Sequence, residues 1–473
     1  MPYKKRSLVS ICRIALGTLF LVVVCLCPAF PTPADLPLLR EHITAYNLEQ
    51  HKTSLSDQSY RGEEGILRIK PEIGRSFGFN VLINQDYIKA TELYGEAEDL
   101  FEKAVEAMTT CEEEHYPGEH VNKVAELAVR HNQAIALAWE HMMSYRSKLT
   151  AEIDDRLNAD NSFCLMEKLL AENVERTSYN LRDTLGSFYN RCQGLDEDAA
   201  LNLENIKFVN YVFHKFTENA AAETKTRFDL DISNRKDDSD SGSAWKIALG
   251  KSSSRFSSVL EAVFEKHQKT GYPVDELLFL ALIWQESDYD SRNVSYVGAA
   301  GLTQIMPTTA KGLGMKNIFA PPYFKEAGSL LGRERRLKHK AKNLLREMTE
   351  ENSLVHAKQA RNLTQGSLDC RKKRKELFVR YRQELLKAGT DDRLDPHKAL
   401  EFGLKYFSQM MKIQKGDASL ALASYNAGPH RVKQYNGIPP FEETINFRNR
   451  VLNYYRFYQS RVKNHLSEQA ATR

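Results

Sequence analysis

The carboxylate of Glu286 is the group in this sequence that is best placed to do chemistry. It lies at the end of the apolar run "LLFLALIWQES", residues 277–287. A helix that is apolar nearly all round is buried in a core, and a carboxylate at its C-terminal end meets the negative end of the helix dipole. Burial and this dipole both raise the pKa of a carboxyl group. Such a group can act as a general acid near neutral pH. The alternative is a solvated glutamate at a helix end.

A second stretch with chemical potential follows nine residues later, as "SYVGAAGLTQIMPTTA", residues 295–310. Gly298 and Gly301 enclose two alanines, a composition that allows a tight turn and close approach of backbone to a ligand. Gln304 supplies an amide that can both donate and accept hydrogen bonds. These groups suit the N-acetyl and hydroxyl groups of an amino sugar.

A third stretch, "ALASYNAGPHRV", covers residues 421–432. An alanine-rich helix leads to Tyr425 and Asn426 and ends at Gly428, which precedes a proline. A tyrosine and an asparagine at a helix end can line a cleft. The same pair also occurs in ordinary helix caps, so this stretch has little weight alone.

In this order, the three stretches resemble the catalytic domain of the soluble lytic transglycosylases. That domain has a lysozyme-like fold, and its last motif is matched by "ETINF" at residues 443–447. The resemblance covers roughly residues 256–315 and 393–462, and it does not cover the N-terminal helices. It implies that the glycan strands of peptidoglycan are the substrate and that no cofactor takes part.

The resemblance also assigns roles to individual residues. It makes Glu286 the catalytic acid and base, and it gives Tyr425 a place close to the reacting sugar. The implied substrate-binding positions are Ser295, Gln304, Met306, Tyr425, Asn426 and Glu443. Two positions depart from the family pattern: Thr303 replaces a methionine, which could alter a cleft wall, and Phe447 replaces a tyrosine, which removes a hydroxyl.

The implied reaction breaks the β-1,4 bond between N-acetylmuramic acid and N-acetylglucosamine. Glu286 protonates the leaving oxygen and then takes the proton of the sugar's own C6 hydroxyl, which closes a 1,6-anhydro ring. Ordinary glycosidases use two carboxylates, and Asp288 or Asp290 could be the second one in a muramidase that hydrolyses the same bond. We expect both to be solvated loop residues. A further alternative is a glycan-binding component of an envelope complex that lacks catalytic activity.

The chain has 473 residues, of which 42% are hydrophobic and 27% are charged, so two or three globular domains are expected. Apolar stripes with helical spacing predict a helical bundle over residues 36–225; one stripe consists of Leu93, Ala97, Leu100, Ala104 and Met108. A polar linker is expected at residues 226–255, and a lysozyme-like domain at residues 256–465. The predicted fold class is therefore mainly α.

The first 34 residues have the pattern of a secretory signal, with a basic head, an apolar stretch and small residues at a cleavage site. We therefore expect export to the periplasm or cell envelope; an uncleaved membrane anchor is the alternative, and lipidation at Cys25 or Cys27 is a further one. The remaining cysteines form no CxxC motif and no cluster with histidine, so no metal site is expected. One or two disulfides could form among Cys111, Cys164, Cys192 and Cys370.

A basic insertion separates the motifs. Residues 333–387 contain 17 Lys and Arg against 7 Asp and Glu, a local net charge of +10 in a chain whose total is +4. We predict a helical hairpin over residues 330–390 that projects from the catalytic domain. It could attract the protein to an anionic envelope surface, or simply be solvated. Nucleic acid is not an expected partner of an exported protein, whereas the N-terminal bundle could bind a protein.

Overall fold

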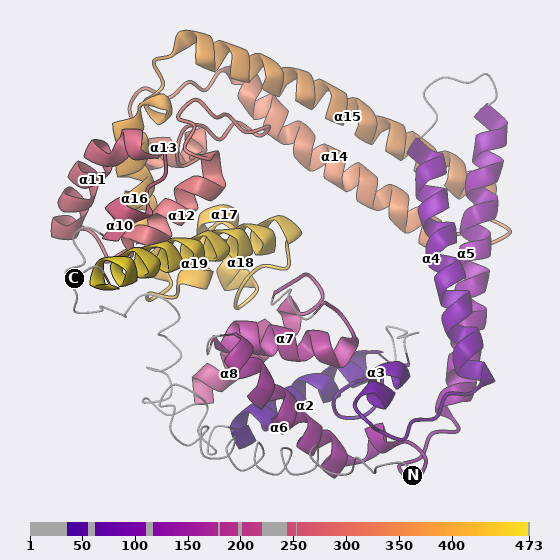
Figure 1. Cartoon of the computed structure of the whole chain (residues 1–473). Helices are drawn as coiled ribbons and strands as arrows, with labels where there is room; N and C mark the ends of the chain where they lie inside the picture. Colours follow the sequence, from indigo (N-terminus) through magenta and orange to yellow (C-terminus); the bar gives the residue numbers. More distant parts are fainter. Residues whose placement is uncertain are drawn as a thin grey trace, which may run out of the picture.

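The protein folds into helices joined by loops, and a computed structural model shows how they are arranged (Figure 1). The described residues are 36–54, 62–109, 117–177, 180–196, 201–219, 244–251 and 253–471. Within them the loops pair only in isolated β-bridges, so the prediction of a mainly α fold is confirmed. The expected signal at residues 1–34 lies outside the described residues, as does Cys111; the thiols of Cys164, Cys192 and Cys370 are free.

Residues 36–219 form the N-terminal unit. Its helices are α2 (Leu36–Ser54), α3 (Pro71–Ser76), α4 (Gln85–Thr109), α5 (Pro117–Arg146), η1 (Asp155–Leu157), α6 (Ala159–Arg176), α7 (Leu181–Gln193) and α8 (Ile206–Asn219). The pair α4 and α5, which we call the first hairpin, is long and antiparallel, and the predicted stripe is buried in it at Ala97, Leu100, Ala104 and Met108. The other helices gather into a compact group at the base of this hairpin (Figure 1).

Residues 244–471 form the C-terminal unit. Its helices are α10 (Ala244–Ala248), η3 (Ser254–Phe256), α11 (Ser257–Thr270), α12 (Glu276–Ser287), α13 (Pro307–Leu313), α14 (Pro322–Arg346), α15 (Ser353–Ala388), η4 (Asp392–Leu394), α16 (Pro396–Ile413), α17 (Ala418–Ala427), α18 (Pro429–Gln434) and α19 (Glu442–Ala471). Helix α12 runs through the core, and residues 278–283 in it are all buried. This burial follows from a sequence that is apolar on every side of the helix.

The expected linker is shorter than residues 226–255 at its C-terminal end. Trp245 is buried there, and its ring lies 5.3 Å from the ring of Phe264. Trp245 therefore fixes α10 to the core of the C-terminal unit. A tryptophan side chain buries a large apolar area. This explains why the polar composition of the segment did not prevent packing here.

The basic insertion is the helix pair α14 and α15, which we call the second hairpin. Its far end does not stand free, as a projecting hairpin would, but packs against the first hairpin. The side-chain amide of Asn132 donates to the carbonyls of Leu345 and Met348, at 3.2 and 2.8 Å. Alanines and leucines of both hairpins share one apolar cluster at this contact. The second hairpin therefore has a charged surface along its length and an apolar tip that packs against the first hairpin.

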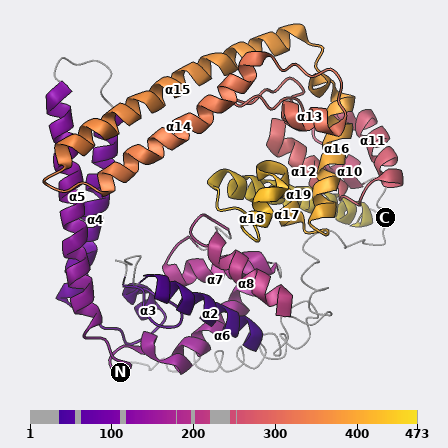
Figure 2. The same ribbon diagram turned by 180° about the vertical axis from the view of Figure 1, so that it is seen from behind.

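The two units also touch directly, away from the hairpins. Arg448 of α19 forms an ion pair with Asp183 of α7 at 2.9 Å, and Arg182 pairs with Asp417 at 2.7 Å. With both contacts in place, the units and the hairpins close into a ring in the two opposite views (Figures 1 and 2). None of the described helices has the length and apolarity that a membrane crossing requires.

Candidate active site

Helix α12 presents Glu286 in its last turn, and both ends of the helix are fixed. The carboxylate of Asp275 caps its first turn by accepting from the backbone N–H of Leu278 at 3.0 Å. Asp288 ends the helix in the left-handed region, with a φ of 50°, which turns the chain sharply. Trp284 stacks on Tyr454 of α19, with 4.3 Å between the ring centroids. These contacts hold the last turn, and with it the carboxylate, against the long C-terminal helix.

The environment of Glu286 favours its protonated form. The residue is partly buried, and burial raises the pKa of its carboxyl well above the ordinary value, with the charge of Glu443 raising it further. Burial also raises the pKa of Tyr425, and Glu286 contributes to that shift. Glu443 is therefore close enough to raise the pKa of Glu286, and Glu286 is close enough to raise the pKa of Tyr425. The arrangement can supply a proton near neutral pH.

The glycine-rich loop is held by two of the predicted sugar-binding residues. The hydroxyl of Ser295 accepts from the backbone N–H groups of Val297 and Ala299, at 3.3 and 2.9 Å. The side-chain Nε2 of Gln304 donates to the carbonyls of Asn293 and Gly301, at 3.0 and 2.8 Å. Gln304 itself has a φ of 45°. Both residues therefore shape the loop, and the Oε1 of Gln304 is its remaining polar atom.

An arginine that the sequence analysis missed fastens this loop to the rest of the unit. Arg393 of η4 is 1% exposed and pairs with Asp391 through two hydrogen bonds of 2.9 and 2.8 Å. Its Nη1 donates to the loop carbonyls of Gly298 and Ile305, and its Nη2 donates to the hydroxyl of Tyr381. Arg393 lies in a polar stretch of the sequence, and nothing in that stretch indicates that its side chain is buried.

Tyr425 lies beneath the loop, and its hydroxyl donates to the carbonyl of Thr303 at 2.7 Å. Its ring is stacked parallel to that of Phe447, with 6.5 Å between centroids. The side chain of Thr303 is buried and donates to Ala399, so this departure from the family pattern affects the core rather than a cleft wall. Phe447 presents an apolar face to Tyr425, where a hydroxyl is not needed for the stacking.

The remaining predicted residues lie around the same helix ends. Asn426, at the end of α17, accepts from the hydroxyl of Thr444 at 2.7 Å, and Met306 precedes α13 and is partly buried. Asp288 and Asp290 are exposed. Across the residues that the structure describes, His, Cys, Asp and Glu side chains form no group of three or more that could hold a metal ion.

The sequence matches the transglycosylase SLT domain over residues 262–327 and 375–447. The matched segments contain Glu286, the glycine-rich loop, Tyr425 and Glu443, and the gap between them falls within the second hairpin. The C-terminal unit contains a transglycosylase SLT domain. The second hairpin is thus largely additional to the SLT domain, apart from its base.

Individual relatives match this chain over a shorter segment or at lower identity. A transglycosylase of the enterobacteria phage PRD1 is 41% identical over 63 residues, which are 13% of this chain and 24% of that protein. The 70 kDa soluble lytic transglycosylase of Escherichia coli is 13% identical, with a TM-score of 0.27 over 82% of this chain and 65% of its own. An inactive mutant of lytic transglycosylase Slt from Pseudomonas aeruginosa is 14% identical, with a TM-score of 0.25 over 80% and 68%. The chain spans about a quarter of the length of the phage protein and about two thirds of the length of each of the two solved structures.

We expect Tyr425→Phe to lower the turnover of the SLT domain and to change its stability only modestly. The substitution keeps the ring stacked on Phe447 but leaves the carbonyl of Thr303 without its donor. Such a loss costs about 1–2 kcal/mol. Thermal melting together with turnover of soluble muropeptides measures both effects. Full activity with a much larger loss of stability would show that Tyr425 is a core residue only.

Proposed function

We propose that the protein is a lytic transglycosylase of peptidoglycan. Glu286 protonates the oxygen of the β-1,4 bond between N-acetylmuramic acid and N-acetylglucosamine as positive charge develops on the sugar. The resulting carboxylate then accepts the proton of the C6 hydroxyl, which attacks the anomeric carbon. The bond to the leaving sugar breaks, a 1,6-anhydro ring forms, and no water is consumed.

The observation that carries this proposal is the raised pKa of Glu286 in a matched SLT domain. A carboxyl that keeps its proton near neutral pH can act first as an acid, and its conjugate base can act in the second step. Tyr425 and the loop that Ser295 and Gln304 hold would border the reacting sugar. Met306, Asn426 and Glu443 are proposed as further substrate contacts.

A muramidase is the second candidate, and the charge of Glu443 near Glu286 favours it. The carboxylate of Glu443 is exposed and close enough to raise the pKa of Glu286, and a second carboxylate is what a hydrolysing glycosidase requires. Digestion of purified sacculi followed by mass spectrometry separates the two reactions. Transglycosylation gives products that end in anhydromuramic acid, whereas hydrolysis gives reducing ends heavier by one water.

We further propose that the second hairpin draws the protein to an anionic surface of the envelope, where the predicted signal would direct it. Arg335, Lys338, Arg371 and Lys375 are all exposed on α14 and α15, whereas the buried Arg374 is neutralised by Glu334 at 2.8 Å. The exposed side chains are free to face a charged surface, because the apolar tip already fixes the hairpin in the ring.

Replacing Arg335, Lys338, Arg371 and Lys375 by Gln should weaken binding to vesicles that contain anionic lipid at least tenfold. Each basic residue near such a surface contributes about 1 kcal/mol, and the attraction is screened by salt over about 8–10 Å. Vesicle sedimentation at low and physiological salt measures the effect. The matched control replaces four exposed basic residues of the first hairpin: Lys89, Lys103, Lys123 and Arg130. Equal binding of both variants would refute the role of the second hairpin.

A further inference from the structure

Two short patterns of the C-terminal unit occur a second time in the N-terminal unit. Residues 298–307 read "GAAGLTQIMP" and residues 62–71 read "GEEGILRIKP", with both glycines, the isoleucine and the proline at the same spacing. The sequence "DDRL" occurs at residues 154–157 and again at residues 391–394. In each unit the loop precedes a short helix that begins with its proline, α3 or α13.

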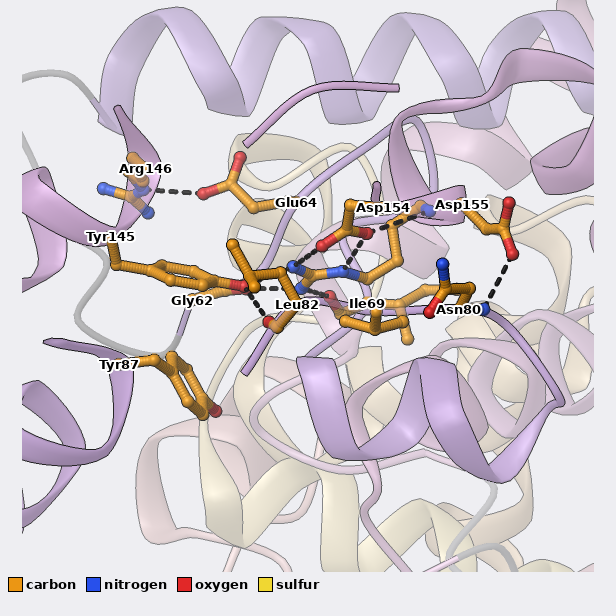
Figure 3. A network of polar contacts seen from close by, with 12 residues as sticks. Gly62, Glu64, Ile69, Asn80, Leu82, Tyr87, Tyr145, Arg146, Asp154 and Asp155 are labelled. Atoms are coloured by element: carbon orange, nitrogen blue, oxygen red, sulfur yellow. Dashed lines mark hydrogen bonds and ion pairs between the residues drawn. The ribbon is translucent and has the colours of Figure 1, made fainter. Parts of the chain in front are cut away.

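The arginine network of the C-terminal unit is repeated as well (Figure 3). Arg156 is 1% exposed, like Arg393, and its bonds follow the same pattern of atoms. Nε and Nη2 contact Asp154 at 2.9 and 2.8 Å, Nη1 contacts the carbonyls of Gly62 and Ile69 at 2.8 and 2.9 Å, and Nη2 contacts the hydroxyl of Tyr145 at 2.6 Å. A buried network with matching donors and acceptors is a strong constraint on a fold.

The residues beside each arginine also correspond. The backbone N–H of Asp155 donates to the carbonyl of Asn80 at 2.8 Å, and that of Asp392 donates to the carbonyl of Asn317 at 2.8 Å. Asn80 and Asp155 lie together in Figure 3. The order of elements agrees too: among the described helices, α2, α3, α4, α5, η1, α6, α7 and α8 correspond in order to α12, α13, α14, α15, η4, α16, α17 and α19, and the short α18 is additional in the C-terminal unit. The N-terminal unit is a second copy of the same fold, including its hairpin.

The register between the first helices of the two copies is set by one hydrogen bond. The hydroxyl of Ser287 in α12 donates to the carbonyl of Leu302, next to the second loop glycine, at 2.8 Å. In α2 the side-chain amide of Asn47 donates to the carbonyl of Ile66, next to the corresponding glycine, also at 2.8 Å. Asn47 of α2 therefore corresponds in position to Ser287 of α12.

With this register, Tyr46 takes the place of Glu286. Burial raises the pKa of the Tyr46 phenol to about 12, so it keeps its proton and cannot serve as an acid near neutral pH. Residues 204–210, "ENIKFVN", correspond to "ETINF" and the two residues after it, and Phe208 lies 5.3 Å from the ring of Tyr46. The N-terminal copy has thus kept the frame of the site and lost its catalytic carboxyl.

A pocket with a volume of about 200 Å³ lies at this position of the N-terminal unit. Aromatic rings on its wall belong to Tyr46, Phe188, Tyr189 and Phe208. Its polar wall includes Arg68, which is held by Glu63 at 3.2 Å, and the amides of Asn47 and Gln193. Arg68 has a φ of 49° and corresponds to Gln304, whose φ is 45°.

We propose that this pocket binds one N-acetylated amino-sugar residue of a glycan strand without cleaving it. The partly exposed rings of Tyr46 and Tyr189 offer flat apolar faces to a pyranose ring, while fixed amides and a guanidinium offer donors and acceptors to its hydroxyl and N-acetyl groups. The volume suits a single ring rather than an oligosaccharide. The choice of sugar class rests on the proposed function of the C-terminal unit, whereas the existence of the second site rests on the repeated fold.

The test uses the full chain carrying Glu286→Gln, so that the ligand is not consumed, and tri-N-acetylchitotriose as the probe. Calorimetric titration should reveal two sites per chain. Arg68→Asn should weaken one of them at least tenfold, because hydrogen bonds to charged groups are among the stronger ones. Asparagine tolerates the positive φ of this position. Leu67→Phe, which adds bulk to the pocket wall, should remove the same site even if Arg68→Asn proves unstable.

Arg130→Asn is the matched control, since Arg130 is an exposed arginine of the same unit outside the pocket, and it should leave both sites unchanged. A single site that Gln304→Ala removes and that Arg68→Asn and Leu67→Phe leave intact would overturn the inference. Product analysis of the wild-type protein on sacculi is read separately. Titration of the Glu286→Gln chain that finds no second site, with anhydro products still formed by the wild type, refutes the inference alone. Two sites without any cleavage by the wild type refute the proposed function alone.

Discussion

Glu286→Gln is expected to reduce the cleavage of peptidoglycan by about 10²–10⁴-fold, the usual contribution of general acid catalysis. Glutamine has nearly the same shape as glutamic acid but cannot donate the proton that the leaving oxygen needs. The measurement is the release of anhydro-ended muropeptides from purified sacculi by a variant with a native melting profile. Near-normal release by this folded variant would exclude Glu286 as the acid.

The same variant should also show a stability difference that depends on pH. The pKa of Glu286 is raised in the folded protein, first by burial and then by Glu443, so the folded state holds a proton that the unfolded state has lost. The stability that this group contributes is therefore complete below its unfolded pKa and falls as pH rises toward its folded pKa. Glutamine does not titrate. Melting curves should show Glu286→Gln gaining stability relative to wild type as pH increases from about 4 to 8.

Arg393→Met is expected to cost the C-terminal unit about 3–5 kcal/mol, the usual penalty for removing one partner of a buried ion pair. The carboxylate of Asp391 would remain buried without its partner, and the carbonyls of Gly298 and Ile305 would lose a donor. Because these carbonyls belong to the loop, activity should fall with stability. Chemical denaturation measures the loss of stability, and turnover of soluble muropeptides by the folded variant measures the loss of activity.

Arg156→Met provides a matched comparison, because its network has the same geometry in the other unit. It should destabilise the N-terminal unit by a similar amount, while the folded fraction keeps its turnover of small soluble muropeptides. Combining Arg393→Met with Asp391→Leu should recover part of the lost stability, since no unpaired charge then remains buried. A change below about 1 kcal/mol for both single variants would contradict the structural role of the two arginines.

The sequence was sufficient to predict the C-terminal unit where local pattern and packing agree. The apolar run before Glu286 predicts a buried helix, and α12 is that helix. The stripe that includes Leu100 and Ala104 correctly predicts a long helix, α4, with that face buried. Helical periodicity identifies a buried face in such cases because one side of the helix must leave water.

The same periodicity could not show what each face packs against. Residues 36–225 were expected to form a bundle because their stripes resemble those of antiparallel helices. Among the residues described there, α4 and α5 form a long pair, while α2, α6, α7 and α8 share a separate core. The short loop at residues 62–71 and the sequence at residues 154–157 carry the information about the fold. Each is too brief to be convincing alone, and comparing the two halves of the chain would have been the way to find them.

The direct contact between the units has a consequence for the order in which the protein can form. Part of the apolar core of the N-terminal unit, around Phe216, is completed by Ala423, Val432, Ile438 and Ile445, which follow more than 200 residues later. At a synthesis rate of about 5–20 residues per second, the early half waits roughly 10–40 s on the ribosome with this surface uncovered. During that interval the nascent chain is a substrate for chaperones and is prone to aggregate. A protein truncated before the second half should therefore accumulate in inclusion bodies, although its own helices carry a complete copy of the fold.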